Sequence, residues 1–391
     1  MKIAILTSGI LPIPAVQGGA VENLIDFYLE YNNKYHLHQI TVYSVNHPKL
    51  IHIKGIDTEV NHYHHIDTIS LMAKIKKRIF LLTQGKHCHY HYTIEYFFNE
   101  ALKHIRNNHY DIIIVENRPG YAFKLKERTS SVLVLHQGND FLNKETCQHK
   151  KLYDAYSCII NNSLYITNRV KTINPSDSKC KTVLNGIDTK LFFQASVVPR
   201  SAMGLAKKDF VIVYSGRLIE EKGILPLIQA IKQLNYIPNL KLLIIGASNY
   251  GKDKHPSTFI EQLIKEAEQI KDKVIFTGFI DYQKIPSHLK IADIAIVPSM
   301  WDEPFGLTVI EAMAAGLPLI TTRSGGIPEI CEGVAIIVER DNIVENLINA
   351  IQDLYQNLER REQMKRASLE RALSFDKELF AQNFFNALPQ V

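Results

Sequence analysis

Two carboxylates and two cations lie in segments of this sequence that suit the binding of a phosphorylated, hydroxyl-rich ligand. Glu303 and Glu311 are separated by seven residues, and Arg217 and Lys222 lie in the glycine-bounded segment Gly216–Gly223. A guanidinium group can fork onto phosphate oxygens and an ammonium group can supply a point charge. Carboxylates accept hydrogen bonds from sugar hydroxyls. These residue types together predict a site for the diphosphate and the hydroxyl groups of a nucleotide sugar.

The segment around the two glutamates also carries a predicted helix start. The sequence from Gly306 to Ala315 reads as a helix after a loop. Its first turn would present backbone N–H groups to phosphate or sugar oxygens, and it comprises Gly306, Leu307 and Thr308. Glu311 is then placed to accept hydrogen bonds from a ribose diol, and Glu303 is placed to accept hydrogen bonds from the sugar hydroxyls. The E-x7-E spacing alone is common, but Pro304-Phe305-Gly306 makes it specific.

A glycine pair near the N-terminus could hold an anion. Gln17-Gly18-Gly19 follows the first predicted strand and precedes a helix that begins near Ala20. Glycines let the backbone approach a ligand, and a helix N-terminus offers N–H groups to an anion. The pattern is not GxGxxG and no acidic residue follows the second strand, which disfavours a dinucleotide site. An ordinary loop is the alternative.

A histidine ends a predicted strand in the first half. His136 follows Val132–Leu135, so its imidazole is expected at the carboxyl end of a parallel sheet. There it could bond the transferring sugar or help an acceptor hydroxyl lose its proton. A purely structural histidine is the alternative.

Short apolar runs alternate with helical periodicity along the whole chain, which predicts parallel doubly wound sheets. The predicted strands are Lys2–Thr7, Gln39–Val45, Asp111–Glu116, Val132–Leu135, Cys158–Asn161, Lys181–Leu184, Phe210–Ser215, Lys241–Ile245, Lys273–Thr277, Ile294–Pro298, Leu319–Thr321 and Ala335–Val338. Residues after Asn342 read as helical. We predict an N-terminal domain over residues 1–188, a C-terminal domain over 189–374 and a final helix over 375–391.

The bulk composition narrows the class of protein. A chain of 391 residues with 46% hydrophobic and 22% charged residues suits two globular domains and excludes disorder. No apolar run approaches the roughly 20 residues that span a bilayer, which predicts a cytoplasmic protein. The five cysteines include no CxxC pair and are expected to be reduced. The first 188 residues carry a net charge of +6, which suits either an anionic partner or a solubilising surface.

Two further features have two interpretations each. The histidine-rich stretches 62–65 and 87–91 could ligate zinc, but their spacing favours histidines of loops or of an acceptor surface. Residues 71–82 are basic and amphipathic, so they form either an interfacial helix on the inner leaflet of a membrane or a packed helix with a solvated basic face.

The motifs resemble those of the retaining glycosyltransferases of family 4, which have the GT-B fold, an α/β architecture of two Rossmann-like doubly wound domains facing a cleft. The resemblance covers nearly the whole chain and is strongest from residue 210 to residue 330. The matching pieces are Gly18-Gly19, His136, Asn185-Gly186-Ile187-Asp188, Gly216-Arg217, Lys222-Gly223, Thr277-Gly278-Phe279, Pro304-Phe305-Gly306, Glu311-Ala312-Met313-Ala314, Gly316-Leu317-Pro318-Leu319-Ile320 and Gly325-Gly326-Ile327-Pro328-Glu329. Asn139-Asp140 departs from the family pattern after the histidine.

This resemblance implies a role for each matched residue. Arg217 and Lys222 would hold the diphosphate, Glu311 the ribose, and Glu303 the donor sugar. The turn Gly278-Phe279-Ile280 would lie near the base. The implied catalytic residues are His136, Arg217, Lys222 and Glu303. The implied donor-binding residues are Gly18, Gly19, Gly216, Arg217, Lys222, Gly278, Phe279, Ile280, Glu303, Phe305, Gly306, Leu307, Thr308 and Glu311.

The resemblance also implies the reaction. A nucleotide-diphosphate sugar, most often a UDP-sugar, would donate its sugar with retained configuration to a saccharide or lipid-linked saccharide acceptor. The reaction would belong to capsule, exopolysaccharide or lipopolysaccharide synthesis. The last helix, near Phe375–Ala387, would return to the first domain. No DxD motif ends a strand, so we expect no metal. We also expect no cofactor and no nucleic acid as partner. The alternatives are a non-catalytic glycosyltransferase-like partner, a phosphorylase-like enzyme and a nucleotide-sugar epimerase. The sequence does not determine the oligomeric state.

Overall fold

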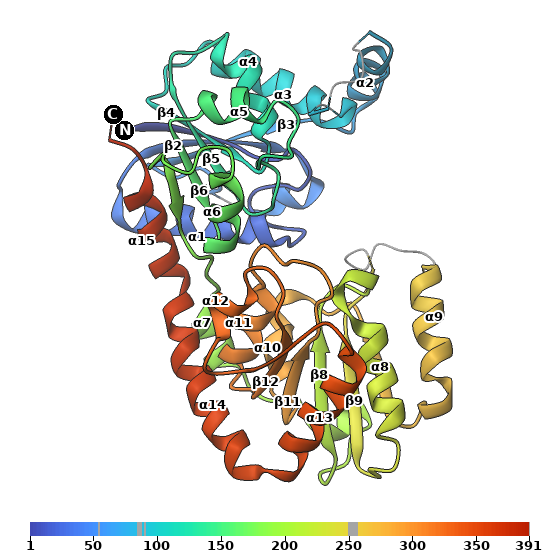
Figure 1. The fold of residues 1–391 in the computed structure, drawn as a ribbon. Helices are drawn as coiled ribbons and strands as arrows, with labels where there is room; N and C mark the ends of the chain where they lie inside the picture. Colours follow the sequence, from blue (N-terminus) through green and yellow to red (C-terminus); the bar gives the residue numbers. More distant parts are fainter. Residues whose placement is uncertain (54, 84–87, 90, 249–256, 391) are drawn as a thin grey trace. The chain divides into compact units, whose positions relative to one another are not determined.

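A computed structural model of the chain describes residues 1–391 except 54, 84–87, 90, 249–256 and 391. The chain forms two compact units. Unit 1 comprises Met1–Gly186 and Lys377–Val391, and unit 2 comprises Ile187–Asp376. The division at Gly186 lies two residues before the end of the predicted N-terminal domain. Helices cover both faces of the sheet in each unit (Figure 1).

Unit 1 contains a seven-stranded sheet in the order β3-β2-β1-β4-β5-β6-β7, and each pair of neighbouring strands is parallel. The central strands carry apolar side chains on both faces, as expected of a parallel sheet covered by helices. The strands are β1 (Lys2–Leu6), β2 (Gln39–Val45), β3 (Asn61–Ile66), β4 (Ile112–Glu116), β5 (Val132–Gln137), β6 (Cys158–Asn161) and β7 (Cys180–Thr182).

The helices of unit 1 are α1 (Ala20–Tyr35), α2 (Leu71–Thr83), α3 (Tyr92–Ile105), α4 (Ala122–Lys126), α5 (His149–Ala155), α6 (Leu164–Lys171) and α15 (Lys377–Ala387), with the 3-10 turns η1 (Pro48–His52) and η2 (Pro119–Tyr121). Side chains of α3, α4, α5 and α6 share one buried cluster with the sheet, and those of α1 and α15 share the other.

The last helix belongs to unit 1 because it packs on α1. The rings of Tyr28 and Phe384 stack with centroids 4.4 Å apart. Ion pairs flank this apolar contact, with 2.9 Å between Lys34 and Glu378. The C-terminal helix therefore completes one face of the first sheet, although 190 residues of unit 2 precede it in the chain.

Unit 2 contains a six-stranded parallel sheet in the order β10-β9-β8-β11-β12-β13. Its strands are β8 (Phe210–Ser215), β9 (Leu240–Ile245), β10 (Val274–Gly278), β11 (Ile294–Val297), β12 (Leu319–Thr322) and β13 (Ile336–Val338). Its helices are α7 (Thr189–Phe193), α8 (Ile224–Gln233), α9 (Thr258–Ala267), α10 (Ile285–Leu289), α11 (Leu307–Ala314), α12 (Ile327–Cys331), α13 (Ile343–Gln356) and α14 (Leu358–Ala372). The short turns are η3 (Arg200–Met203), η4 (Glu220–Lys222), η5 (Glu268–Ile270), η6 (Tyr282–Lys284) and η7 (Leu373–Phe375).

The second sheet also has a continuous apolar core. Leu227 and Ile231 of α8, together with Leu347 and Ile351 of α13, are fully buried in one cluster with apolar side chains of the sheet. Their spacing of four residues is that of one helix face. The strand order changes direction between β8 and β11, and in such sheets ligands bind outside the carboxyl ends of the strands at that point.

Two sequence-based expectations need correction. Residues 61–66 form the edge strand β3, so His62, His64 and His65 do not lie in a loop, and their other predicted place, on an acceptor surface, stays a prediction. Cys88 and Cys147 form a disulfide, whereas all five cysteines were expected to be reduced. The other three, Cys158, Cys180 and Cys331, are free. His87 and Tyr90, from the second histidine-rich stretch, lie outside the described residues.

Candidate functional site

Lys222 and Glu303 form an ion pair in unit 2. The Lys222 ammonium also donates a hydrogen bond to Glu303 Oε1, which accepts a second one from Ser299 Oγ at 2.8 Å. Glu303 is buried, and Lys222 is half-buried with its ammonium 5.6 Å from the Trp301 ring. Two predicted site residues, 81 positions apart in the chain, are therefore in contact.

The loop that carries Lys222 is held at the end of β11 by a glycine. Gly223 has a φ of 69°, and a Cβ there would lie 1.8 Å from the backbone oxygen of Pro298. Only glycine fits this close approach without movement of the backbone. The Met300 N–H donates to the Glu221 carbonyl at 2.8 Å, which ties the same two segments together. The backbone therefore fixes where the Lys222 side chain begins.

The segment around Glu303 is held from a third strand. The Ser299 carbonyl accepts hydrogen bonds from Thr322 Oγ1 at 2.6 Å and from Ser324 Oγ at 2.8 Å. Thr322 ends β12, and the Gly326 N–H donates to the Glu303 carbonyl at 2.8 Å. Polar groups at the carboxyl ends of β11 and β12 thus position the Glu303 carboxylate.

Arg217 lies in the same loop as Lys222 but has a different environment. Its side chain is exposed, and no hydrogen bond or ion pair joins the guanidinium to another residue of the described chain. Its backbone carbonyl accepts from Tyr214 Oη at 2.8 Å. An anchored backbone with an exposed guanidinium suits the binding of an anion from solution.

Glu311 is buried in the second turn of α11. Burial raises its pKa from 4.5 to about 7, and a hydrogen bond with the Tyr282 side chain opposes this shift. Tyr282 in turn packs edge-on against Phe192 at 6.2 Å. A carboxyl with this pKa changes its charge near neutral pH, so its capacity to accept hydrogen bonds depends on pH.

The start of α11 is a backbone site. Gly306 is the N-cap with a φ of 121°, and no side chain caps the helix. The N–H groups of Leu307 and Thr308 lie in the first turn, where helical carbonyls cannot pair with them. The Phe305 side chain is buried against Phe375, at 6.2 Å, so only its backbone can face a ligand.

The third segment of unit 2 with predicted donor contacts is the end of β10. The Gly278 carbonyl accepts from the Gly246 N–H at 3.0 Å, which joins this turn to the end of β9. Phe279 is exposed and Ile280 is half-buried. A flat exposed aromatic side chain beside a carboxyl-edge turn suits contact with a base.

The predicted anion site at the start of α1 differs from expectation. Gly19 has a φ of 115°, and a Cβ there would lie 2.2 Å from Glu22 Oε2. The buried Glu22 carboxyl also accepts from its own backbone N–H, and burial raises its pKa to about 7. The helix start therefore already holds a carboxyl group, beside Gly18 and Gly19, where only open N–H groups were expected.

His136 is the last residue but one of β5 and lies beside an acidic partner that the sequence interpretation missed. Its Nδ1 lies 2.9 Å from Glu116 Oε2, and both residues are buried. Tyr28 Oη donates to Glu116 Oε1 at 2.8 Å. Glu116 and His136 are paired in register on neighbouring strands. An acidic residue at the end of the apolar run Ile112–Val115 was the available signal.

The His136 ring is packed and oriented. Its centroid lies 4.9 Å from that of Phe384 on α15. The Nε2 atom is buried and makes no hydrogen bond within the described chain. Asp140, which follows the histidine in sequence, instead pairs with Arg169 at 2.8 Å and accepts from Asn143 Nδ2 at 2.9 Å. These contacts give Asp140 a structural role in its loop.

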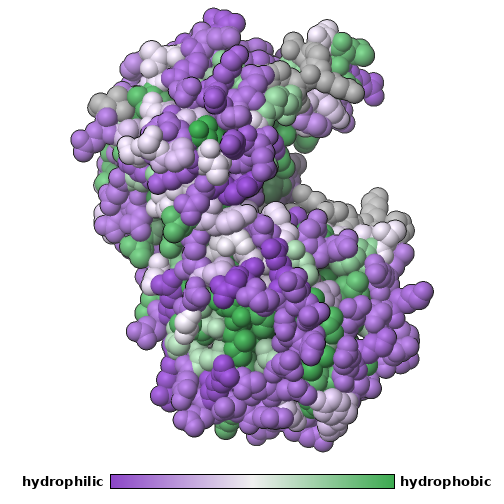
Figure 2. Space-filling view, in the orientation of Figure 1, coloured by the Kyte–Doolittle hydropathy of each residue, from purple (hydrophilic) through white to green (hydrophobic). Residues whose placement is uncertain are grey.

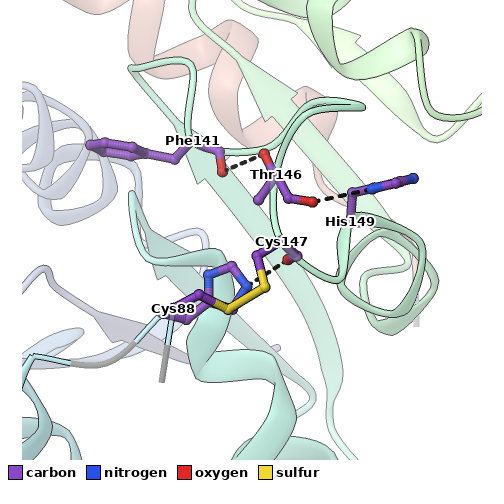
Figure 3. The surroundings of a disulfide bond; sticks show 6 residues. Cys88, Phe141, Thr146, Cys147 and His149 are labelled. Atoms are coloured by element: carbon purple, nitrogen blue, oxygen red, sulfur yellow. Dashed lines mark hydrogen bonds between the residues drawn. A yellow bond between two sulfur atoms is a disulfide. The ribbon is translucent and has the colours of Figure 1, made fainter. Parts of the chain in front are cut away.

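One group of side chains in the described residues has ligand atoms close enough for a metal ion, namely Cys88, His89 and Cys147. Figure 3 shows the two sulfurs joined, and the His89 Nε2 lies 2.6 Å from the Cys147 carbonyl oxygen. Disulfide sulfurs have no thiolate to offer a metal. This bonded pair therefore does not form a zinc centre.

Comparison with known proteins gives a family match for unit 2. A sequence profile described as "Glycosyl transferases group 1" matches residues 200–371, which carry every predicted site residue of unit 2. This match agrees with the family expected from the motifs. The two parallel-sheet, Rossmann-like units have the GT-B architecture, which confirms the expected fold.

Two relatives of this chain come from Bacillus subtilis (strain 168). Spore coat protein SA is 28% identical over 96% of this chain and 95% of its own length. Putative glycosyltransferase YtcC is 27% identical over 92% of this chain and 84% of its own length. The structure of Anabaena Alr3699/HepE in complex with UDP and glucose superposes with a TM-score of 0.73. That pair is 19% identical and covers 99% and 98% of the two chains, a likeness of fold.

Proposed function

We propose that this protein is a glycosyltransferase that moves a sugar from a nucleotide-diphosphate sugar to a saccharide or lipid-linked saccharide. The observation that carries the proposal is the cluster at one edge of the unit 2 sheet. It combines the exposed Arg217 guanidinium, the Lys222–Glu303 pair and the uncapped start of α11. Cations and N–H groups suit a diphosphate, and carboxylates suit sugar hydroxyls.

Each group has a task in this proposal. Arg217 and Lys222 stabilise the negative charge that grows on the departing diphosphate. Glu311 accepts from the ribose hydroxyls, and Glu303 accepts from the sugar. Since Lys222 and Ser299 both bond Glu303 Oε1, this carboxylate is oriented as a hydrogen-bond acceptor. UDP-sugars are the first donors to test, because the similar Anabaena protein was solved with UDP and glucose.

Transfer with retained configuration is what the family resemblance implies. A double-displacement enzyme needs a carboxylate positioned as a nucleophile. Glu303 is instead engaged by a cation and a hydroxyl, so we propose reaction on one face of the sugar. The leaving phosphate then accepts the proton of the acceptor hydroxyl, and the protein orients the two substrates and stabilises charge. His136, oriented by Glu116, would contact the sugar or the acceptor.

The cellular role proposed is synthesis of a cell-surface polysaccharide, by a protein that works in the cytoplasm. No metal or cofactor takes part in the steps assigned to these residues. One specific alternative is a non-catalytic partner with a glycosyltransferase fold. The presence of Arg217, Lys222, Glu303 and Glu311 at one sheet edge favours the enzyme, because a non-catalytic protein has no need of the full donor set.

A donor screen followed by product analysis tests this proposal. Thermal unfolding of the full chain is measured with a panel of UDP-, GDP- and ADP-sugars, since ligand binding stabilises the folded state. The best donor is then incubated with saccharide acceptors, and the anomeric configuration of the product is determined by NMR. A retained configuration supports the proposal. Binding of a donor without any turnover favours the non-catalytic partner, and an inverted product contradicts the mechanism.

A further inference from the structure

Helix α2 of unit 1 leaves most of its apolar side chains in solvent. Ala73 is the one buried residue among its thirteen. Leu82 is 85% exposed and Leu71 is 75% exposed. The other exposed apolar residues of this helix are Met72, Ile75, Ile79 and Leu81. Isolated exposed apolar residues are ordinary, but a set gathered on one short helix marks an interaction surface.

The spacing places these side chains on one face. Met72, Ile75, Ile79 and Leu82 follow one another at intervals of three, four and three residues. Such positions form a stripe along one side of a helix. We call these four residues the α2 stripe. Figure 1 shows α2 at the outer end of unit 1, and Figure 2 shows hydrophobic and hydrophilic side chains together at that place.

The helix is a formed element with its opposite side fixed to unit 1. Ser70 Oγ accepts from the Ala73 N–H at 3.2 Å, as an N-cap residue does. Lys77 donates to the Thr68 carbonyl, and its ammonium lies 5.7 Å from the Tyr96 ring on α3. Because Lys77 and Ala73 face the domain, the α2 stripe faces away from it.

Positive charge accompanies the stripe. The helix contains Lys74, Lys76, Lys77 and Arg78 and no acidic residue. Lys74 and Arg78 are exposed and four positions apart, so they form a row next to the stripe. Lys76, on the other flank, lies 3.7 Å from Glu100. An apolar stripe with a cationic border matches the interface of an anionic bilayer, which combines acyl chains with phosphate groups.

We propose that α2 docks on an anionic membrane surface, lying in the interface with its stripe among the acyl chains and Lys74 and Arg78 at the phosphates. A helix of this length extends roughly 20 Å, which suits lying on a bilayer better than crossing it. Across the described residues, no helix is long and apolar enough to span a membrane. The proposed docking does not depend on the transferase function. Only the suggestion that it brings the enzyme to a lipid-linked acceptor rests on that proposed function.

Vesicle sedimentation of the full chain tests the docking. Wild-type protein is mixed with vesicles of phosphatidylglycerol and phosphatidylethanolamine, and separately with phosphatidylcholine vesicles. We expect binding to the first and little to the second, with a decrease at high salt. The I79S/L82S and K74E/R78E variants should each lower the vesicle partition coefficient at least about tenfold. Thermal unfolding is expected to stay unchanged, because the altered side chains are exposed.

Matched controls make the result specific to α2. The L37S/I264S variant removes two exposed apolar side chains elsewhere, and K265E/R366E reverses two exposed cations in unit 2. Both controls should bind anionic vesicles as wild type does. The proposal is overturned if wild type ignores these vesicles or if I79S/L82S binds them equally well. A wild-type dimer that becomes monomeric in I79S/L82S, without vesicle binding, would assign the stripe to self-association.

Sugar transfer to a water-soluble acceptor tests the transferase function independently of membrane docking. With a water-soluble saccharide acceptor, I79S/L82S should turn over donor at the wild-type rate. Loss of vesicle binding with intact transfer supports docking by α2. Vesicle binding by a chain that never transfers sugar would leave the docking established and contradict the transferase function.

Discussion

Lys222 and Glu303 are joined across the carboxyl edge of the unit 2 sheet, and Ser299 Oγ donates to the same carboxylate oxygen at 2.8 Å. The pair is a structural tie between the loop after β8 and the loop after β11. It is also the centre of the proposed donor site. The two roles can be separated, because the first affects stability and the second affects binding.

Replacement of Lys222 by glutamine should lower the free energy of unfolding by about 2 kcal/mol, because it leaves the buried Glu303 carboxylate without its cation. Denaturant unfolding measures this loss. The control is Lys271→Gln, whose exposed pair with Glu268 should contribute less than about 0.5 kcal/mol. Equal losses in the two variants would show that the Lys222–Glu303 pair does not stabilise unit 2.

The Glu311 carboxyl should make stability depend on pH. Its folded pKa of about 7 lies above the unfolded value of 4.5, so the folded state binds more protons between these values. Stability from this group is therefore present at low pH and lost as pH rises towards 7. Between about pH 5 and about pH 8 wild type should lose about 2.5 kcal/mol more than Glu311→Gln. Parallel stability curves for the two proteins would contradict the raised pKa.

Donor binding should follow the opposite trend with pH. If the ionised Glu311 carboxylate accepts from the ribose, the affinity for UDP should rise about tenfold between about pH 6 and about pH 8. Calorimetric titration measures this change. The Glu311→Gln variant should bind weakly with no such rise. A wild-type affinity that is flat over this range would remove Glu311 from the ribose contact.

Among the buried residues that orient His136, Glu116 should cause the largest loss of unfolding free energy when it is replaced. Glu116→Ala leaves both Tyr28 Oη and His136 Nδ1 without their buried partner, and should destabilise the protein by about 2–4 kcal/mol. Tyr28→Phe removes one hydrogen bond and should cost about 1 kcal/mol. Denaturant unfolding measures both, with exposed Tyr92→Phe as the control. A Tyr28→Phe loss as large as that of Glu116→Ala would argue against Glu116 as the shared acceptor.

The disulfide gives a prediction for thiol chemistry. Unfolded protein kept free of reductant should show three reactive thiols, from Cys158, Cys180 and Cys331, and five after reduction. Thiol labelling followed by mass spectrometry counts them. Reduction should also lower stability by about 2–4 kcal/mol, because the bond closes a long loop between Cys88 and Cys147. Five thiols before reduction would contradict the bond.

Strands were predictable from the sequence where all of their side chains are buried and the run of residues is therefore apolar throughout. The runs Phe210–Ser215 and Ile112–Val115 are apolar on both faces, which is what a central parallel strand requires. Strand β3 has no such signal, because five of its six residues are Asn, His or Tyr. It is stabilised by pairing with β2 and by the His64 ring, which packs 5.4 Å from Tyr43 and 3.7 Å from His104. These are tertiary contacts, which a local pattern cannot show.

The same limit applies to the candidate site. Residue types and family motifs grouped Arg217, Lys222, Glu303 and Glu311 as one predicted site, in the segments that follow the predicted strands Phe210–Ser215 and Ile294–Pro298. Glu116 and Tyr28 were missed because Glu116 contacts His136 and Tyr28, which lie 20 and 88 positions away from it in the chain. The Cys88–Cys147 bond was missed for the same reason, since 59 positions separate the two residues.

The measurement that tests the proposed function most directly is the rate of nucleotide release coupled to sugar transfer. Wild type, Arg217→Ala and Glu311→Gln are compared with one donor and one soluble acceptor, and exposed Arg366→Ala serves as the control. We predict that wild type and Arg366→Ala turn over at equal rates. Arg217→Ala and Glu311→Gln should each lose at least about a hundredfold in kcat/KM while remaining folded. Near-wild-type turnover in either site variant would contradict the assignment of this sheet edge as the donor site.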